Sequence, residues 1–430
     1  MTTDRRWDVV IIGAGIGGVT ALYYARQAGL RALVLERQDV VGGLWATLPA
    51  WQDIQNSRFD WTLGDLPIAG EDSASVAANI RAWVDAFDLS PSIRLGTPVV
   101  RAAPVGGGWC VSTPAGEYRS TYLISATGAH NRAVVPSIER HAPAVREFHS
   151  STLQDPSVLA GRDVVVVGGG ASAYDLLDLC LERGARRVAW VYRSLKWMAP
   201  TRKPKRDAAD IRGLARMQML GTPAEEISRA IHQDLRARYE KFGLEDILPA
   251  KDFDFRRDQL FPGRRTMIAN LGRIERFPGE VAGIHGSTVR LRRDREIQAD
   301  LLLWGTGYEM DLSYFALPEL AGTTKIDAMA RRCGSLFVSR DAPNLYFLAP
   351  CLLESTSASP WCYSIASRTI VSHMRGEAML GPEPVEEKLN YFDLARYLAP
   401  RDPASFPAGW EAAYLRMLDE HPEGTPLPIP

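Results

Sequence analysis

The sequence predicts an α/β fold made of two strand–turn–helix units, with the second unit inserted into the first. Each unit has an apolar, β-branched run that meets a glycine cluster and then becomes helical, over residues 8–28 and 163–182. Continuous apolar runs are typical of buried parallel strands, and a strand, a glycine turn and a helix open a Rossmann βαβ unit. Strands that run into Thr-Gly turns recur at residues 122–128 and 300–308. We therefore expect two Rossmann-like domains, with a chain that leaves the first and later returns to it.

The domain boundaries follow from these positions. We expect a first domain over residues 1–160, a second over 161–299, and the remainder of the first over 300–430, ending in a proline-rich tail. Residues 93–124 alternate short apolar runs with glycine and proline turns, which predicts an antiparallel β-meander inserted in the first domain.

A helical insertion is expected in the second domain, over residues 207–274. Thr222 to Glu225 form a capping box with Pro223 at the first helical position, and Gly243 stops the helix. This helix either packs on its own domain or serves as a lid or a dimer surface.

Composition excludes several classes of protein. The 430 residues include 50 basic and 51 acidic side chains, and 46% of them are hydrophobic, so the chain is neither disordered nor broadly charged for nucleic acid or an anionic membrane. Five cysteines without a Cys-x-x-Cys pair suit reduced thiols and exclude dithiol redox chemistry. No secretory signal or membrane-length apolar run is present, so we expect a soluble cytoplasmic protein.

The first glycine cluster, Gly13-x-Gly15-x-x-Gly18, predicts a pyrophosphate site. The first glycine allows a tight turn, the second lets the backbone approach the ligand, and the third lets the helix lie close to the strand. Unpaired N–H groups at the helix N-terminus favour the anion. Glu36 ends a second apolar strand about 20 residues further on, where a ribose hydroxyl needs an acceptor.

The second cluster, Gly168-x-Gly170-x-x-Ala173, predicts a second pyrophosphate site, to which Ser172 adds a hydroxyl. The next strand ends in Arg193-Ser194, where an NAD-binding unit would carry an acid. A guanidinium can hold a 2′-phosphate, so Arg193 and Lys196 favour NADPH over NADH. The basic side chains that follow, up to Arg206, are interpreted as a solvated loop.

The chain resembles the two-dinucleotide-binding-domain flavoproteins, in which FAD occupies the first unit and a nicotinamide cofactor the second. The resemblance rests on Gly42-Gly43-Leu44-Trp45, on the second glycine cluster and on Gly305-Thr306-Gly307-Tyr308. Within that superfamily these residues look most like the class B flavin monooxygenases, which include flavin-containing and Baeyer–Villiger monooxygenases. The run from Arg193 to Pro200 is similar to one found in the Baeyer–Villiger branch.

The resemblance implies an oxidoreductase that uses NADPH and O₂ and inserts one oxygen atom into a small organic molecule through a C4a-(hydro)peroxyflavin. N- or S-oxygenation and Baeyer–Villiger insertion both stay open. The family's hydrogen-bonding Asn aligns with Gln55 by ungapped spacing, and Asn56 is adjacent, so either amide is a candidate. Only His149-Ser150 matches the family fingerprint between the domains. His149 either contacts the nicotinamide cofactor or packs at a domain hinge.

The partners expected are a small-molecule substrate and O₂, without nucleic acid or membrane and without a metal; a homodimer is left open. Two alternatives to the monooxygenase are an NADPH-dependent flavin reductase or dehydrogenase and a binding protein that holds FAD and NADPH without turnover. The residues expected to bind the two cofactors are Gly13, Gly15, Gly18, Glu36, Arg37, Gly43, Leu44, Trp45, Val100, Thr127, Gly128, Gly168, Gly170, Ser172, Ala173, Arg193, Ser194, Lys196 and Gly307.

Overall fold

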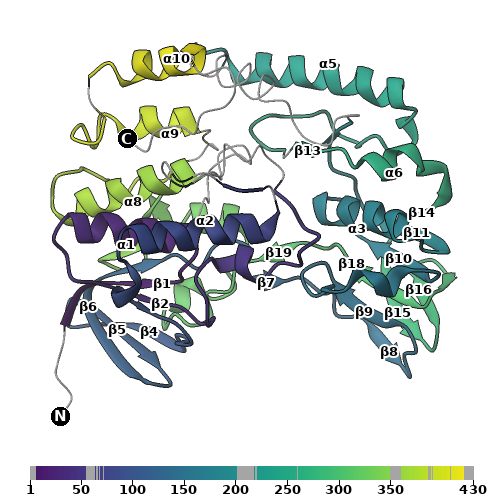
Figure 1. The fold of residues 1–430 in the computed structure, drawn as a ribbon, viewed down its shortest axis with the longest axis horizontal. Helices are drawn as coiled ribbons and strands as arrows, with labels where there is room; N and C mark the ends of the chain where they lie inside the picture. Colours follow the sequence, from purple (N-terminus) through teal and green to yellow (C-terminus); the bar gives the residue numbers. More distant parts are fainter. Residues whose placement is uncertain are drawn as a thin grey trace.

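The protein consists of two α/β domains that lie side by side (Figure 1). The computed structural model describes residues 6–54, 72–200, 220–258, 260–348, 360–385, 391–406 and 408–420, together with the separate residues 63, 66, 68–70, 217 and 389. Each domain has a sheet whose central strands are parallel, as the apolar runs predict. The predicted α/β class is confirmed.

The first domain is built on a nine-stranded sheet in the order β20-β21-β22-β6-β1-β2-β3, from which β5 and β4 extend beside β6. Strand β6 pairs parallel with β1 on one edge and antiparallel with β5, so the expected meander is a continuation of the central sheet. The strands are β1 (Arg6–Ile12), β2 (Ala32–Leu35), β3 (Ile93–Arg94), β4 (Arg101–Val105), β5 (Gly108–Thr113), β6 (Gly116–Ser125), β20 (Cys333–Gly334), β21 (Val338–Ser339) and β22 (Leu345–Phe347).

Helices from both ends of the chain complete this domain. α1 packs against α8, and hydroxyl pairs join them, with Thr20 Oγ1 2.9 Å from Ser367 Oγ and Tyr24 Oη 2.6 Å from Ser364 Oγ. Residues far apart in sequence therefore share one hydrophobic core. The helices are α1 (Ile16–Gln27), α2 (Ser73–Ala86), α7 (Ile326–Ala330), α8 (Pro360–Met374), α9 (Tyr391–Leu398) and α10 (Trp410–Glu420).

The second domain contains a five-stranded parallel sheet in the order β14-β11-β10-β18-β9 and a smaller sheet in the order β17-β16-β15-β8. Two separate apolar clusters fill the space on the two faces of the parallel sheet. The elements are β8 (Glu139–His141), β9 (Arg146–His149), β10 (Asp163–Val167), α3 (Ala171–Glu182), β11 (Arg187–Tyr192), α6 (Arg265–Ala269), β14 (Ile274–Pro278), β15 (Val281–His285), β16 (Thr288–Leu291), β17 (Arg295–Gln298) and β18 (Leu301–Trp304).

The chain crosses between the domains earlier and returns later than the boundaries expected at 160 and 300. Strands β8 and β9 already belong to sheets of the second domain, and β18 pairs with β10 and β9 rather than with the first sheet. All four residues of β18 are buried, as expected for a parallel strand whose sheet is covered on both faces. The two chain segments that cross between the domains pair with each other through the antiparallel strands β7 (Arg132–Ala133) and β19 (Tyr308–Glu309). This two-stranded ribbon lies between the domains in Figure 1.

The helical insertion packs on its own domain. α5 (Ala224–Phe242) runs along the outer side of the second domain, near β13 (Phe261–Pro262) and α6 in Figure 1. Its apolar face buries Ile227, Leu235 and Tyr239, and the Tyr239 ring lies 5.4 Å from the Trp197 ring. The helix ends at Gly243 in the left-handed conformation, as predicted, but Pro223 occupies the N-cap rather than the first helical position.

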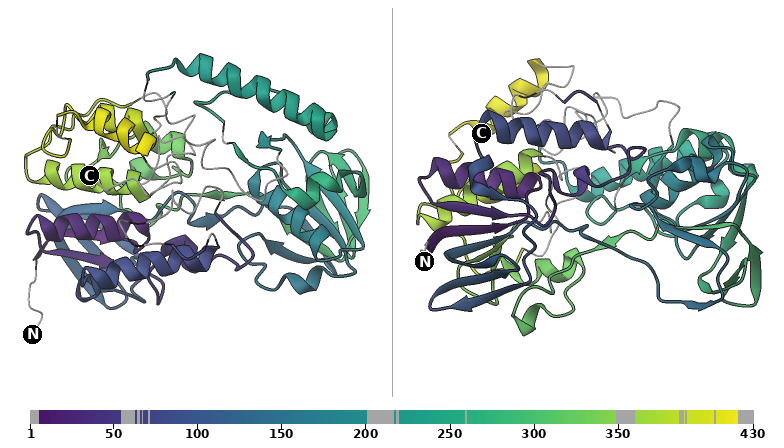
Figure 2. Two further views of the ribbon diagram at one scale, coloured as in Figure 1. Left: turned by 45° about the horizontal axis from the view of Figure 1, so that its top comes forward. Right: turned by 60° about the horizontal axis from the view of Figure 1, so that its bottom comes forward.

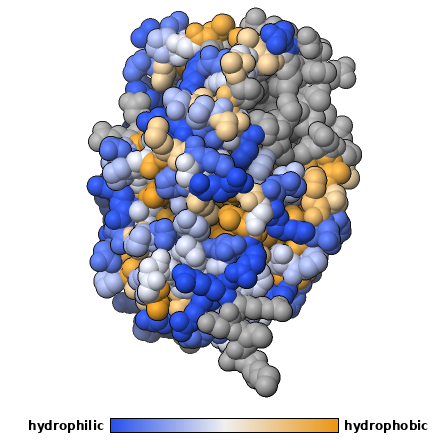
Figure 3. Space-filling model, turned by 90° about the vertical axis from the view of Figure 1, so that its left-hand side faces the viewer, coloured by the Kyte–Doolittle hydropathy of each residue, from blue (hydrophilic) through white to orange (hydrophobic). Residues whose placement is uncertain are grey.

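The face over the first domain carries many hydrophilic side chains with apolar ones between them, as Figure 3 shows. Within the described residues, no helix combines the length and the apolar character that crossing a membrane requires. Figure 2 shows the two domains from two further directions.

Candidate active site

A cavity of about 1330 Å³ lies at the junction of the two domains and is lined by both glycine turns. This volume exceeds the range of about 300–1,000 Å³ usual for a site that takes one small ligand. The predicted residues that line it are Gly13, Gly15, Glu36, Arg37, Gly43, Leu44, Trp45, Thr127, Gly128, Gly168, Gly170, Ser172, Arg193, Ser194, Lys196 and Gly307.

The first glycine turn leaves the N-terminus of α1 open to the cavity. Gly13 has a φ of +103°, and a Cβ there would lie 2.7 Å from the Ala126 carbonyl oxygen, so the turn requires glycine. Gly15 is the N-cap of α1, without a side-chain cap, and a Cβ on it would meet nothing nearer than Gly43 Cα at 3.5 Å. The uncapped N–H groups and the space in front of Gly15 form a cradle for an anion.

Glu36 is held at the end of β2 by backbone groups. Its Oε2 accepts the Ala14 N–H at 2.6 Å and its Oε1 accepts the Gln38 N–H at 2.9 Å. A carboxylate oxygen has a second lone pair, so both oxygens keep capacity for a hydroxyl in the cavity. The Arg37 side chain donates to the Asn131 carbonyl beside it. This end of the cavity suits the ribose of a dinucleotide.

The second glycine turn repeats the geometry of the first. Gly168 has a φ of +136°, and a Cβ on it would lie 2.2 Å from the Gly305 carbonyl oxygen. Gly170 caps α3 without a side-chain hydrogen bond, and its added Cβ would meet only Lys196 Cγ at 3.9 Å. The backbone of Lys196 donates to the Gly169 carbonyl at 2.8 Å, which fixes the loop after β11 against the turn. The chain therefore offers two equivalent anion cradles to one cavity.

Three residues predicted to bind a cofactor lie outside the cavity wall. Gly18 and Ala173 are buried where each helix crosses its strand, and a Cβ on Gly18 would lie 1.8 Å from the Gly13 carbonyl oxygen. Both residues allow the helix to pack closely against the turn that precedes it. Val100 is an exposed residue, and its neighbours Pro98 and Val99 line the cavity instead.

His149 is buried at the domain junction and does not line the cavity. Its Nδ1 accepts the Ser151 N–H, so the proton is on Nε2, which donates to the Gly307 carbonyl at 3.1 Å. The Tyr308 ring packs edge-on at 5.0 Å. Burial lowers the pKa of the ring. We propose from these contacts that His149 packs at the domain junction, which is one of the two alternatives stated above.

We expect the neutral His149 to make folding stability sensitive to acid. Its folded pKa lies below the ordinary value of 6.5, so the unfolded chain binds more protons there and stability falls as the pH drops below 6.5. A His149→Gln variant cannot take up that proton, while its amide can still donate to Gly307. The midpoint temperature of thermal unfolding should fall less steeply between about pH 7.5 and pH 5.5 in this variant than in the unmodified protein. The same dependence of the midpoint temperature on pH in both proteins would contradict the assignment of a neutral His149 in the folded state.

An ion-pair cluster at the cavity wall joins the two domains, and no sequence motif predicts it. Arg264, at the N-cap of α6, contacts Asp175 of α3, and its Nη1 lies 3.6 Å from Asp53 Oδ1 of the first domain. Both carboxylates line the cavity, and the Arg264 side chain is 15% exposed. Burial raises the pKa of Asp175, and Arg264 opposes that rise. Burial also raises the pKa of Asp178, about one turn after Asp175 in α3, to about 6.

The two predicted catalytic amides, Gln55 and Asn56, lie outside the described residues, as does the solvated loop up to Arg206. Asp53, two residues before Gln55, lines the cavity.

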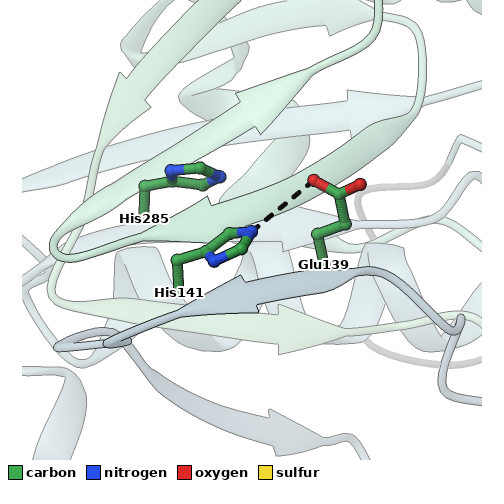
Figure 4. A group of neighbouring side chains, drawn as sticks. All are labelled: Glu139, His141 and His285. Carbon is green, nitrogen blue, oxygen red and sulfur yellow. Dashed lines mark ion pairs between the residues drawn. The ribbon is translucent and has the colours of Figure 1, made fainter.

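One group among the described residues has metal-binding side chains close together, away from the cavity. Ligand atoms of Glu139, His141 and His285, on the paired strands β8 and β15, lie within 4.8 Å of one another (Figure 4). An Arg290 nitrogen lies 3.4 Å from His285 Nε2, so a positive charge already occupies one side of the group. Glu139 and His141 are largely exposed. We assign no metal to this group.

Known proteins share the fold and parts of the sequence. The family model for pyridine nucleotide-disulphide oxidoreductases matches residues 10–213. An FAD-dependent monooxygenase of Aspergillus sclerotiorum is 27% identical over 408 residues, covering 76% of this chain and 70% of that protein. The uncharacterized oxidoreductase CzcO of Bacillus subtilis is 26% identical over 191 residues, which are 43% of this chain and about half, 54%, of that relative's length.

An open crystal structure of cyclohexanone monooxygenase superposes with a TM-score of 0.68 over 98% of this chain and 99% of that one, at 16% identity. The cysteines of the described residues, Cys110, Cys180, Cys333 and Cys362, are buried and form no disulphide. The resemblance stated from the motifs is confirmed. The chain has the fold of solved flavin-dependent monooxygenases and is similar in sequence, over most of its length, to one FAD-dependent monooxygenase.

Proposed function

We propose that the protein is an FAD-dependent monooxygenase that takes reducing equivalents from NADPH and inserts one atom of O₂ into a small organic substrate. The observation that carries the proposal is one cavity onto which two uncapped helix N-termini open, one from each domain. Two dinucleotides bound by their pyrophosphates at Gly15 and Gly170 would extend into the same space. Facing flavin and nicotinamide rings are what hydride transfer requires.

The residues of the first domain fit FAD. The turn at Gly13 and Gly15 would hold the pyrophosphate, and Glu36 would accept a hydrogen bond from a ribose hydroxyl. Trp45 and Leu44, in the short helix Gly43–Ala46, line the cavity beside the turn and would pack against the cofactor. Bound FAD would supply the oxygen chemistry, and the chain would bind and orient it.

The residues of the second domain fit a nicotinamide dinucleotide. The turn at Gly168 and Gly170 would hold its pyrophosphate, and Ser172 lines the cavity at the start of α3. Arg193 extends from the end of β11, where a 2′-phosphate would lie. The Asp53–Arg264–Asp175 cluster would hold the two domains at the separation that brings the reactive rings together.

Oxygen insertion is tested by isotope labelling. The purified FAD-loaded protein is incubated with NADPH, ¹⁸O₂ and a panel of ketones, amines and thioethers, and products are measured by mass spectrometry. We expect one ¹⁸O atom in a product, formed with consumption of NADPH. Oxidation of NADPH with peroxide as the sole oxygen product would favour the reductase alternative, and the class of substrate oxidised distinguishes heteroatom oxygenation from Baeyer–Villiger insertion.

A further inference from the structure

Three charged side chains meet on the cavity wall of the second domain, beyond the end of β11. The Glu280 carboxylate lies 3.5 Å from Arg193 Nη1 through Oε1 and 3.1 Å from Arg292 Nε through Oε2. All three residues line the cavity. Arg193 and Arg292 are mostly exposed, at 77% and 74%, whereas Glu280 is 37% exposed. A carboxylate therefore lies between two guanidinium groups at the place expected for the adenosine ribose.

The backbone fixes this arrangement. Glu280 follows β14, which pairs with β11, and the Gly279 N–H donates to the Tyr192 carbonyl at 2.9 Å, one residue before Arg193. The Arg292 N–H donates to the Glu280 carbonyl at 2.8 Å. Glu280, Arg193 and Arg292 thus lie near the ends of strands. Backbone hydrogen bonds, as well as the exposed side chains, hold these three positions close together.

The charges have opposite consequences for the two nicotinamide cofactors. A carboxylate at this position accepts a hydrogen bond from the 2′-hydroxyl of NADH, whereas arginines hold the 2′-phosphate of NADPH. A phosphate of about two negative charges attracts both guanidinium groups but is repelled by the carboxylate between them. Arg193 alone predicts a strong preference for NADPH, and Glu280 opposes that preference.

We propose that Glu280 and Arg292 are specificity-determining residues at the 2′-position of the adenosine ribose. Arg292 joins Arg193 in holding a 2′-phosphate, and Glu280 accepts the 2′-hydroxyl of NADH and weakens discrimination against it. The protein therefore binds both cofactors with a modest preference for NADPH. This inference rests on the proposed function, because it requires a nicotinamide dinucleotide on the second glycine turn.

Binding of two adenosine nucleotides separates the inference from the enzyme's activity. Isothermal titration of the FAD-loaded protein with adenosine 2′,5′-bisphosphate and with 5′-AMP measures recognition at the 2′-position directly. Glu280→Gln should raise the preference for the bisphosphate by about tenfold, because one like charge is removed at a partly screened contact. Arg292→Ala should lower the affinity for the bisphosphate by about tenfold and leave the affinity for 5′-AMP unchanged.

A matched pair of control variants lies on the same small sheet. Arg290 and Glu296 form an ion pair at 3.6 Å and do not line the cavity, so Arg290→Ala and Glu296→Gln should change neither affinity. The inference would be overturned if Glu280→Gln left the preference for the bisphosphate over 5′-AMP unchanged. It would also be overturned if Arg292→Ala lowered the affinity for both nucleotides equally. Either result would leave the proposed function intact. Failure of the unmodified protein to bind either nucleotide would contradict the proposed function, and with it this inference.

Discussion

Gly15→Ala is expected to yield a folded protein that binds FAD more weakly, and Gly170→Ala one that keeps FAD but binds NADP⁺ more weakly. Both glycines cap a helix at the cavity, and neither added Cβ would approach another protein atom closer than 3.5 Å. The methyl group would instead occupy the space that a pyrophosphate needs. Overpacking of about 1–3 kcal/mol corresponds to roughly a 5- to 150-fold loss of affinity for each cofactor.

The flavin-to-protein absorbance ratio and titration with NADP⁺ measure these two affinities separately. Gly272→Ala is the matched control, because a Cβ there meets nothing within 4 Å and the residue does not line the cavity. Gly18→Ala provides a contrast, since its Cβ would collide with the Gly13 carbonyl and destabilise the fold itself. If Gly15→Ala kept its FAD, or Gly170→Ala lost FAD and not NADP⁺, the two turns would not have the cofactors we assign to them.

Arg264→Ala is expected to cost about 3 kcal/mol in free energy of unfolding, because removing one partner of a buried ion pair leaves carboxylates uncompensated. Asp175 and Asp53, from the two domains, would lose the cation between them. We also expect slower reduction of the flavin by NADPH, since the domains would no longer be held at a fixed separation. Arg264→Lys should restore part of both properties because it keeps the charge but not the two-pronged geometry.

Arg265→Ala is the control for this prediction, since Arg265 is adjacent and exposed. Urea unfolding measures the stability, and stopped-flow absorbance at the flavin band measures the reduction rate. Loss of stability without a change in reduction rate would show that Arg264 has a structural role only. An Arg264→Ala protein as stable as the Arg265→Ala control would contradict the ion-pair assignment altogether.

Local sequence signals predicted the fold and both anion cradles well. Apolar runs and glycine clusters are contiguous, and each contains the strand, the turn and the helix start that make a cradle, as the matching geometry of Gly13 and Gly168 shows. Boundaries were less predictable, because β18 could pair with either domain and its apolar run does not distinguish them.

Pairwise contacts between distant residues could not be predicted. Glu280 meets Arg193 only because β14 lies beside β11, and Arg264 meets Asp53 only because the second domain folds back onto the first. His149 matched a fingerprint by position, yet its surroundings, which decide between a cofactor contact and packing, come from residues 307 and 308 of the return segment. These contacts form in three dimensions and leave no pattern at a fixed spacing.

The central claim is that the first glycine turn would hold FAD and the second NADPH in one cavity, where the bound cofactors would supply the hydride and oxygen chemistry of a monooxygenase. Anaerobic mixing of the purified flavoprotein with NADPH, followed by mixing with O₂ and spectral recording, tests it most directly. We predict bleaching of the flavin by NADPH, then a transient blue-shifted absorbance band that decays faster when substrate is present. No bleaching, or immediate return of the oxidised spectrum with release of peroxide, would contradict the account.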